Sequence, residues 1–134
     1  ERELEHAVQC TRHVFDQHVV LQFAVTNGAP ALRMHNVSVR VEPLGDTDLY
    51  VLESEVPLRV LPYRSTGSCY TVFRTYPTVG TVATSFACEL RFLAITVATD
   101  GPPGSLRRET GAGYPEEIPL HNLELSTADF HPGV

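Results

Sequence analysis

Apolar and polar residues alternate in several stretches of the chain, and this alternation predicts β-strands. In residues 19–26 every second side chain would face a core, and residues 37–42 repeat the pattern. The turn sequence 27–30 (Asn-Gly-Ala-Pro) ends the first strand, and Pro43 ends the second because proline has no amide hydrogen for a sheet. With a third stretch at 85–92, the expected core consists of Val19, Leu21, Phe23, Val25, Val37, Val39, Val41, Phe86, Cys88, Leu90 and Phe92.

The third stretch changes phase along its length. After Phe92 the apolar positions are Leu93, Ile95 and Val97, which lie on the opposite face of a regular strand. We therefore expect either a β-bulge near residues 92–94 or a strand that passes from one sheet to another.

Weaker strand patterns cover residues 8–15, 49–52, 69–74 and 120–126, whereas no helical pattern persists for three turns. The segment 99–117 is rich in Gly, Pro and charge, which predicts an exposed loop. About seven or eight short antiparallel strands with one long excursion are typical of an immunoglobulin-like β-sandwich. We therefore expect an all-β fold with a single domain over residues 1–134.

The stretch VPLRVLPYRSTGSCYT, residues 56–71, is expected to connect the two sheets. Pro57 and Pro62 each remove an amide donor, which favours an extended but irregular edge or crossover segment. Gly67 would supply a sharp turn. Tyr63 and Tyr70 would cover the end of the core with their rings.

The charge of the chain argues against a nucleic-acid partner. The net charge is −6, the isoelectric point is about 5.4, and all ten basic residues are Arg. Only Arg107 and Arg108 are adjacent, so the sequence has no basic cluster that could bind phosphates or an anionic membrane. No apolar run of about 18 residues exists, and direct membrane insertion is not expected.

The cysteines favour a reducing compartment. Cys10, Cys69 and Cys88 are odd in number and form no CxxC pair. Cys88 belongs to the core by its position in the alternation, and Cys69 is expected to be buried, whereas the pattern leaves Cys10 undecided. In a reducing compartment the sequon at residues 36–38 would stay unused.

No catalytic, cofactor-binding or metal-binding residue is expected. The histidines share no metal or catalytic spacing, and Cys69 has no activating base nearby in the sequence. The acidic pairs lie in turn-like segments, and the glycines of the 99–117 segment are not followed by the Lys-Ser/Thr of a phosphate loop. The residues considered are His6, His13, His18, His35, His121, His131, Asp46, Asp48, Glu116, Glu117, Gly101, Gly104, Gly111 and Gly113.

Five segments in order resemble the appendage (ear) region of the coatomer gamma subunit. They are VQCTRHVFDQHVVLQFAVTN (8–27), NVSVRVEP (36–43), VPLRVLPYRSTGSCYT (56–71), ATSFACELRF (83–92) and GYPEEIPLHNLELSTADF (113–130). The resemblance covers nearly the whole chain. It implies a noncatalytic part of the COPI coat that supports protein recruitment in Golgi-to-ER and intra-Golgi vesicle transport. It also implies a cytoplasmic location, peripheral on Golgi membranes and COPI vesicles.

The same resemblance implies an immunoglobulin-like sandwich followed by a helix-containing platform that is absent from this chain. We thus expect a piece of a longer polypeptide. In the family, ARF GTPase-activating proteins bind through an exposed Trp on the platform, and this chain has no Trp. Its expected partners are other coatomer subunits, with ARF GTPase-activating protein binding mainly through the platform, and no partner-binding residue is assigned. The alternatives are an unrelated immunoglobulin-like adhesion or binding module and a small hydrolase.

Overall fold

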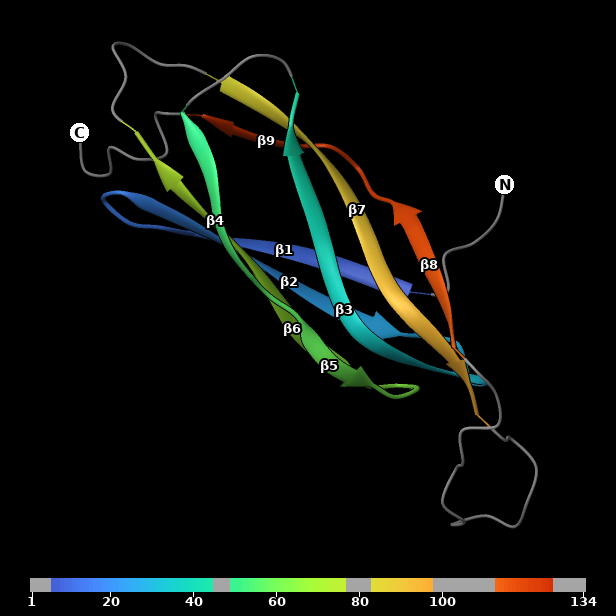
Figure 1. The fold of residues 1–134 in the computed structure, drawn as a ribbon. Coiled ribbons are helices and arrows are strands. Elements are labelled where there is room, and N and C mark those ends of the chain that lie inside the picture. Colours follow the sequence, from blue (N-terminus) through green and yellow to red (C-terminus); the bar gives the residue numbers. More distant parts are fainter. Residues whose placement is uncertain (1–5, 45–48, 77–82, 98–112, 127–134) are drawn as a thin grey trace.

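The computed structural model describes residues 6–44, 49–76, 83–97 and 113–126. These residues form two antiparallel sheets that pack as a β-sandwich (Figure 1). One sheet has the order β1-β2-β6-β4 and the other β5-β3-β7-β8, with β9 also paired to β7. Nine strands lie in the described residues: β1 (His6–Val14), β2 (His18–Asn27), β3 (Leu32–Pro43), β4 (Tyr50–Val56), β5 (Leu58–Leu61), β6 (Thr66–Thr75), β7 (Ala83–Thr96), β8 (Tyr114–Pro119) and β9 (Leu123–Ser126).

This strand order is that of an immunoglobulin-like sandwich. In such domains the first, second, fifth and fourth strands (A, B, E and D) form one sheet, and C, F and G form the other. Here β1, β2, β6 and β4 take the places of A, B, E and D, and β3, β7 and β8 take those of C, F and G. The predicted fold class is therefore confirmed.

The core lies between the sheets, where alternate side chains of β2, β3, β6 and β7 meet. All eleven residues expected in the core are buried. At its centre, the Phe86 ring packs edge-on to Tyr50 with centroids 5.2 Å apart and lies 5.5 Å from Phe73. The core also contains Met34, Leu61, Cys69 and Leu125, which the alternation did not single out.

The prediction of a bulge or a change of sheet near residues 92–94 is wrong, and the extra residue lies on the neighbouring strand, β3. On β7 the buried positions continue in phase through Phe92 to Ala94. The register between β3 and β7 shifts between His35 and Ser38, and Asn36 has a φ of 53°. This extra residue on β3 is a β-bulge, and it lets both Met34 and Val37 face the core although they are three positions apart.

The stretch 56–71 connects the sheets as expected, but Gly67 has a different role. Pro57 separates β4, in the first sheet, from β5 at the edge of the second. The turn comes after β5, where the Ser65 amide donates to the Pro62 carbonyl (3.1 Å) and Arg64 has a φ of 68°. Gly67 lies within β6, and a Cβ added there would be 2.5 Å from Leu58 Cδ2. The prediction of a turn at Gly67 is wrong because the glycine makes room for a leucine.

Gly67→Ala should destabilise the sandwich by about 1 kcal/mol, the low end of the range for overpacking, because the added methyl group meets the flexible end of the half-buried Leu58 side chain and not the backbone. The added methyl group would force Leu58 out of its position. Urea unfolding of Gly67→Ala, Leu58→Ala and the double variant measures the coupling between the two sites. In the double variant the Gly67→Ala penalty should shrink, and an undiminished penalty would show that Leu58 is not the obstacle.

Only residues 113–117 of the predicted loop 99–117 can be compared with the structure. Residues 98–112 lie outside the described residues, whereas Tyr114–Pro119 form β8 against β7. Gly113 approaches β7 closely, since a Cβ there would lie 2.7 Å from Leu93 Cγ. The loop prediction is therefore wrong from residue 114 onward.

Candidate interaction groove

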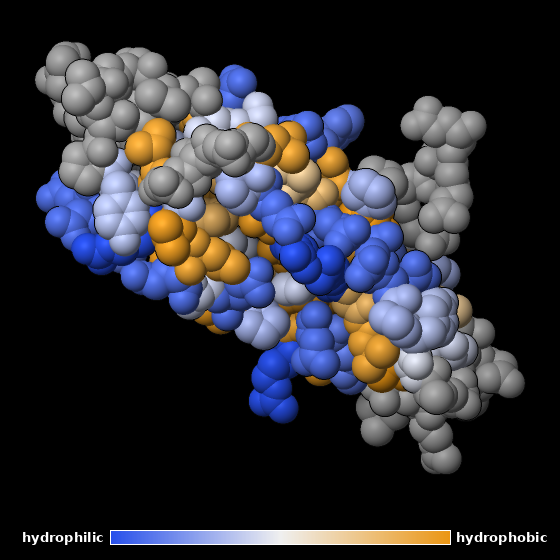
Figure 2. Space-filling model, turned by 45° about the horizontal axis from the view of Figure 1, so that its top comes forward, coloured by the Kyte–Doolittle hydropathy of each residue, from blue (hydrophilic) through white to orange (hydrophobic). Residues whose placement is uncertain are grey.

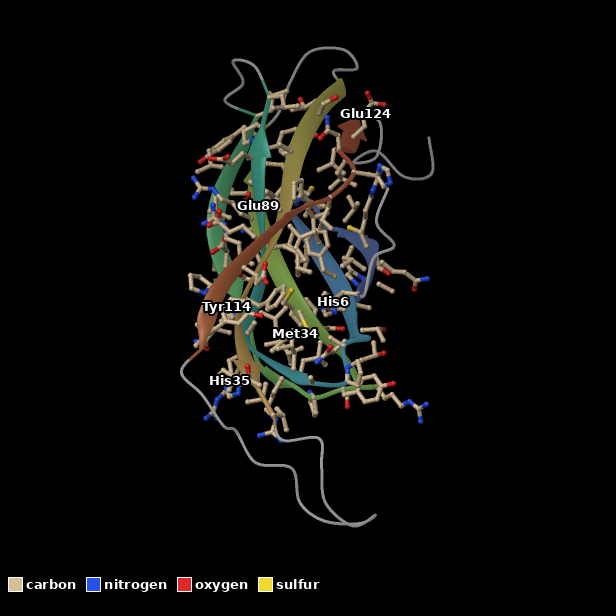
Figure 3. All side chains as sticks on the ribbon, turned by 90° about the vertical axis from the view of Figure 1, so that its right-hand side faces the viewer. His6, Met34, His35, Glu89, Tyr114 and Glu124 are labelled. Atoms are coloured by element: carbon tan, nitrogen blue, oxygen red, sulfur yellow. The ribbon has the colours of Figure 1, made fainter. Side chains whose placement is uncertain are left out.

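The sandwich has an open side between β1, at the edge of one sheet, and β8 and β9 of the other. Figure 3 views the molecule from this side, with His6 labelled on β1, Tyr114 at the start of β8 and Glu124 in β9. A cavity of about 560 Å³ lies there, within the usual size range of ligand pockets. We call it the seam groove, and it is lined by His6, Val8, Cys10, Phe23, Leu32, Cys88, Leu90, Phe92, Glu116, Ile118, Pro119, Leu120, His121, Asn122 and Leu123.

The strand registers direct apolar side chains into the groove. On β1, Val8 lies opposite Val25 and Cys10 opposite Phe23, so both share the core-facing side of the first sheet. On β8, Ile118 lies opposite Leu90, which is buried. The two edge strands do not pair with each other, so these apolar side chains line an open cavity between them.

Glu116 is the one carboxylate among the lining residues. It lies opposite Phe92 on β7 and is half-buried. The His6 ring packs edge-on against the same Phe92, with centroids 5.5 Å apart. Within the described part of the chain the Glu116 side chain forms no hydrogen bond or ion pair, although its backbone belongs to the β7–β8 ladder. The groove thus combines apolar walls with one negative charge that is not paired within these residues.

The two thiols of the groove differ in exposure. Cys88 is buried, and desolvation together with the nearby Cys10 raises its pKa to about 11, although a hydrogen bond with the Leu123 backbone opposes the shift. Cys10 is exposed at the rim, where partial desolvation raises the pKa of its thiol and Arg12 lowers it. Neither thiol therefore has the lowered pKa of a reactive nucleophile.

The other sequence candidates lie apart from one another. His13 hydrogen-bonds Gln22 (2.8 Å), His18 pairs with Glu53 (2.9 Å), and His35 lies at the bulge of β3. Of the histidines, His6 and His121 line the groove. His131, Asp46, Asp48, Gly101, Gly104 and Gly111 lie outside the described residues.

The described ranges contain no arrangement of residues suited to binding a metal ion or to activating a thiol. No group of three or more His, Cys, Asp or Glu side chains there could hold a metal ion. Cys69 is buried as predicted, and desolvation raises its pKa to about 11. A thiol that stays protonated at neutral pH is a poor nucleophile.

Thiol labelling should separate the three cysteines. At pH 8 an alkylating reagent should modify Cys10 quickly and the buried Cys69 and Cys88 slowly, because all three are free and only Cys10 is exposed. Mass spectrometry without reductant should find three modified thiols after unfolding. Cys10→Ser should remove the fast phase, whereas an intrachain disulfide or two fast thiols would contradict this arrangement.

A second surface, at β4, is apolar but interrupted by charge. Val51, Leu52 and Val56 are about half exposed, with Glu53 and Glu55 between them. Figure 2 shows apolar side chains beside strongly polar ones on the face turned toward the viewer. The apolar side chains of β4 are interspersed with carboxylates, whereas Glu116 is the one carboxylate of the seam groove.

Taken together, the described strands are those of an immunoglobulin-like β-sandwich with a groove along one open side. The described ranges contain no helix long and apolar enough to cross a bilayer.

Comparison with known proteins identifies the family. A family model described as the coatomer gamma subunit appendage platform subdomain matches residues 1–126. The chain is 38% identical over 133 residues to rat coatomer subunit gamma-1 and 35% identical over 130 residues to Dictyostelium discoideum coatomer subunit gamma. These alignments cover 96% and 97% of the chain and 14% of each relative. Human coatomer subunit gamma-2 is 36% identical over 132 residues, with 96% and 14% covered.

The chain therefore belongs to the coatomer gamma appendage family, and it spans about one seventh of the length of these relatives. This membership confirms the resemblance of the sequence to the appendage region and sets aside an unrelated adhesion module or hydrolase. The description of the family model departs from the sequence prediction in one respect. It names the platform subdomain, whereas the sequence was expected to be the sandwich subdomain without the platform.

Proposed function

We propose that this chain is a noncatalytic sandwich of a coatomer gamma appendage, and that it supports protein recruitment by the COPI coat. The observation that carries the proposal is the family match over residues 1–126 on a chain whose described residues form a β-sandwich. In this role the protein acts from the cytoplasm, peripheral on Golgi membranes and COPI vesicles, in Golgi-to-ER and intra-Golgi transport. Other coatomer subunits are its partners in the full-length protein.

We further propose that the chain is the immunoglobulin-like part of the appendage, despite the platform name of the matching family model. Two features support this assignment. With β5 and β9 as additional strands, the order β1-β2-β6-β4 over β3-β7-β8 is the immunoglobulin order, and the described residues form strands, where the expected platform contains helix. The chain also has no Trp, the residue on which the expected platform site depends. Binding of ARF GTPase-activating proteins thus requires the neighbouring part of the appendage.

Calorimetry against an ARF GTPase-activating protein fragment tests this division. The longer appendage should bind the fragment, and the present chain alone should bind it at least about tenfold more weakly, a difference of about 1.4 kcal/mol. Residual binding should weaken in high salt, because the exposed positions of the strands are largely polar. Equal affinity would place the site on this chain, and no binding by either form would contradict the recruitment role itself.

A further inference from the structure

The free edges of the sandwich are protected to different degrees. Unpaired strand edges invite pairing with other chains, and proteins block them with short strands, charges, bulges or proline. β5 and β9 are short, and β4 carries Glu53 and Glu55 and a register shift between Leu52 and Ser54. β1, in contrast, is nine residues long, and its segment 7–11 (Ala-Val-Gln-Cys-Thr) contains no charge, proline or glycine.

Hydrogen bonds around β2 establish which way its peptide groups point. The Asn27 amide donates to the Ser65 carbonyl (3.1 Å), and the Asn27 carbonyl accepts from the Arg64 amide (2.9 Å), just before the start of β6. Because peptide groups alternate in direction along an antiparallel strand, the odd-numbered residues of β2 point toward β6 and the even-numbered ones toward β1. The Phe15 amide confirms this, since it donates to the His18 carbonyl (2.8 Å).

It follows that Val8 and Cys10 direct their amides and carbonyls away from the first sheet. They lie opposite Val25 and Phe23, which are odd-numbered residues of β2. Their side chains line the seam groove, while their peptide groups point to its open side. The center of β1 therefore offers both an apolar wall and hydrogen-bonding groups to an incoming strand.

The facing edge on β8 is blocked. The Leu120 amide donates to the Cys88 carbonyl (2.9 Å), so the even-numbered residues of this segment point toward β7. Residues 115, 117 and 119 point away from β7, and two of them are Pro115 and Pro119. Only Glu117 could donate an amide from this edge. An incoming strand would accordingly pair with β1 and not with β8.

We propose that an extended peptide segment of a partner protein binds in the seam groove by pairing antiparallel with β1. The peptide would extend the first sheet, place alternate apolar side chains in the groove, and set a Lys or Arg beside Glu116. Charge complementarity selects this occupant, because Glu116 is the one carboxylate of a lining whose other polar side chains, His6, His121 and Asn122, carry no negative charge. A second copy is a poorer occupant, because each chain carries a net charge of −6. This inference deepens the proposed recruitment role and rests on it.

The probe is the synthetic peptide acetyl-Thr-Leu-Thr-Val-Thr-Lys-Thr-Leu-amide, added to the whole chain. If it adds to β1, amide hydrogen exchange measured by NMR should slow at Val8 and Cys10, and alkylation of Cys10 should slow as well. The matched controls are two isomers with N-methyl groups on the Val and Lys amides or on two Thr amides. In antiparallel pairing the Val and Lys amides face β1, so the isomer methylated on these two amides should bind about tenfold more weakly than the parent peptide. The isomer methylated on two Thr amides should bind nearly as well as the parent.

Two substitutions test the two features of the site, the outward amide of Val8 and the carboxylate of Glu116. Val8→Pro removes the outward amide without removing a β1–β2 hydrogen bond, and it should weaken peptide binding about tenfold, whereas Val8→Thr keeps the amide and most of the affinity. Glu116→Gln should abolish the preference for the Lys peptide over one with norleucine at that position. The melting temperature of each variant shows whether it remains folded. If Val8→Pro does not fold, the N-methyl isomers still test the pairing on the unchanged chain.

Three results would overturn the inference. They are unchanged exchange at Val8 and Cys10 at millimolar peptide, equal affinity of the two N-methyl isomers, and protection of these amides by self-association, seen as a concentration-dependent dimer in ultracentrifugation. A different result is that the peptide leaves these amides unprotected while the longer appendage still binds the ARF GTPase-activating protein fragment. That result would refute peptide binding in the seam groove and leave the recruitment role intact.

Discussion

Phe86→Ala should lower the free energy of unfolding by about 3–5 kcal/mol, the range found when a buried aromatic side chain is truncated. Phe86 is fully buried and packs against Tyr50 and Phe73, which come from the opposite sheet. Its removal leaves a cavity between the sheets and also removes two aromatic contacts. Urea unfolding followed by circular dichroism measures the loss as a lower midpoint with an unchanged slope.

The same substitution at Phe15 is the control. Phe15 is 57% exposed in the turn between β1 and β2, and its replacement by Ala should change stability by less than about 0.5 kcal/mol. Phe23→Ala should lower the free energy of unfolding by less than Phe86→Ala does, because Phe23 borders the seam groove as well as the core. Equal losses at Phe15 and Phe86 would show that the sheets do not pack as described.

Alternation identified the core because it depends only on neighbours in the sequence. Val19 and Val25, or Val37 and Val41, are separated by even numbers of residues, and a regular strand places such residues on one face. The bulge in β3 breaks this rule, since Met34 and Val37 both face inward across an odd spacing. The change of phase after Phe92 does not reveal this bulge in the sequence. Which of two paired strands contains an extra residue depends on the register between them.

The strand β8 escaped prediction because its prolines and glutamates are typical of a loop. In the structure Pro115 and Pro119 occupy positions whose peptide groups point away from β7, so neither removes a sheet hydrogen bond. The even spacing of the two prolines, with Glu116 and Ile118 between them, is the signal that could have identified an edge strand. It is weak without knowledge of the partner strand.

The seam groove could not be predicted from local motifs. Most of its lining comes from β1, β7, β8 and the segment after β8, with single residues from β2, β3 and β9, and these elements are far apart in the sequence. What brings them together is the strand order, which leaves β1 and β8 as unpaired edges of different sheets. The family resemblance supplied the fold and the protein class, but it assigned no residue to this side of the sandwich.

The role of Asn27 also depends on tertiary structure. The sequence placed it at a turn, and it does end β2, yet its side chain is fully buried. Its Nδ2 donates to the carbonyls of Leu32 and Leu61, each at 3.0 Å, and its Oδ1 accepts from the Ala29 amide at 2.9 Å. One amide group therefore joins the end of β2, the start of β3 and the end of β5.

Asn27→Ala should cost about 3–5 kcal/mol, because an unsatisfied buried polar group costs about 1–3 kcal/mol and this substitution removes the partner of three of them. Thr26→Ala is the neighbouring control. Thr26 shares a 2.7 Å hydrogen bond with Thr66 at the surface, where water can replace it, so its loss should cost less than about 1 kcal/mol. Urea unfolding gives both values, and amide exchange should show faster opening at Leu32 and Ala29 in Asn27→Ala alone. A cost below that of Thr26→Ala would mean that water satisfies all three groups, and that the junction of these strands is held by packing and not by the Asn27 side chain.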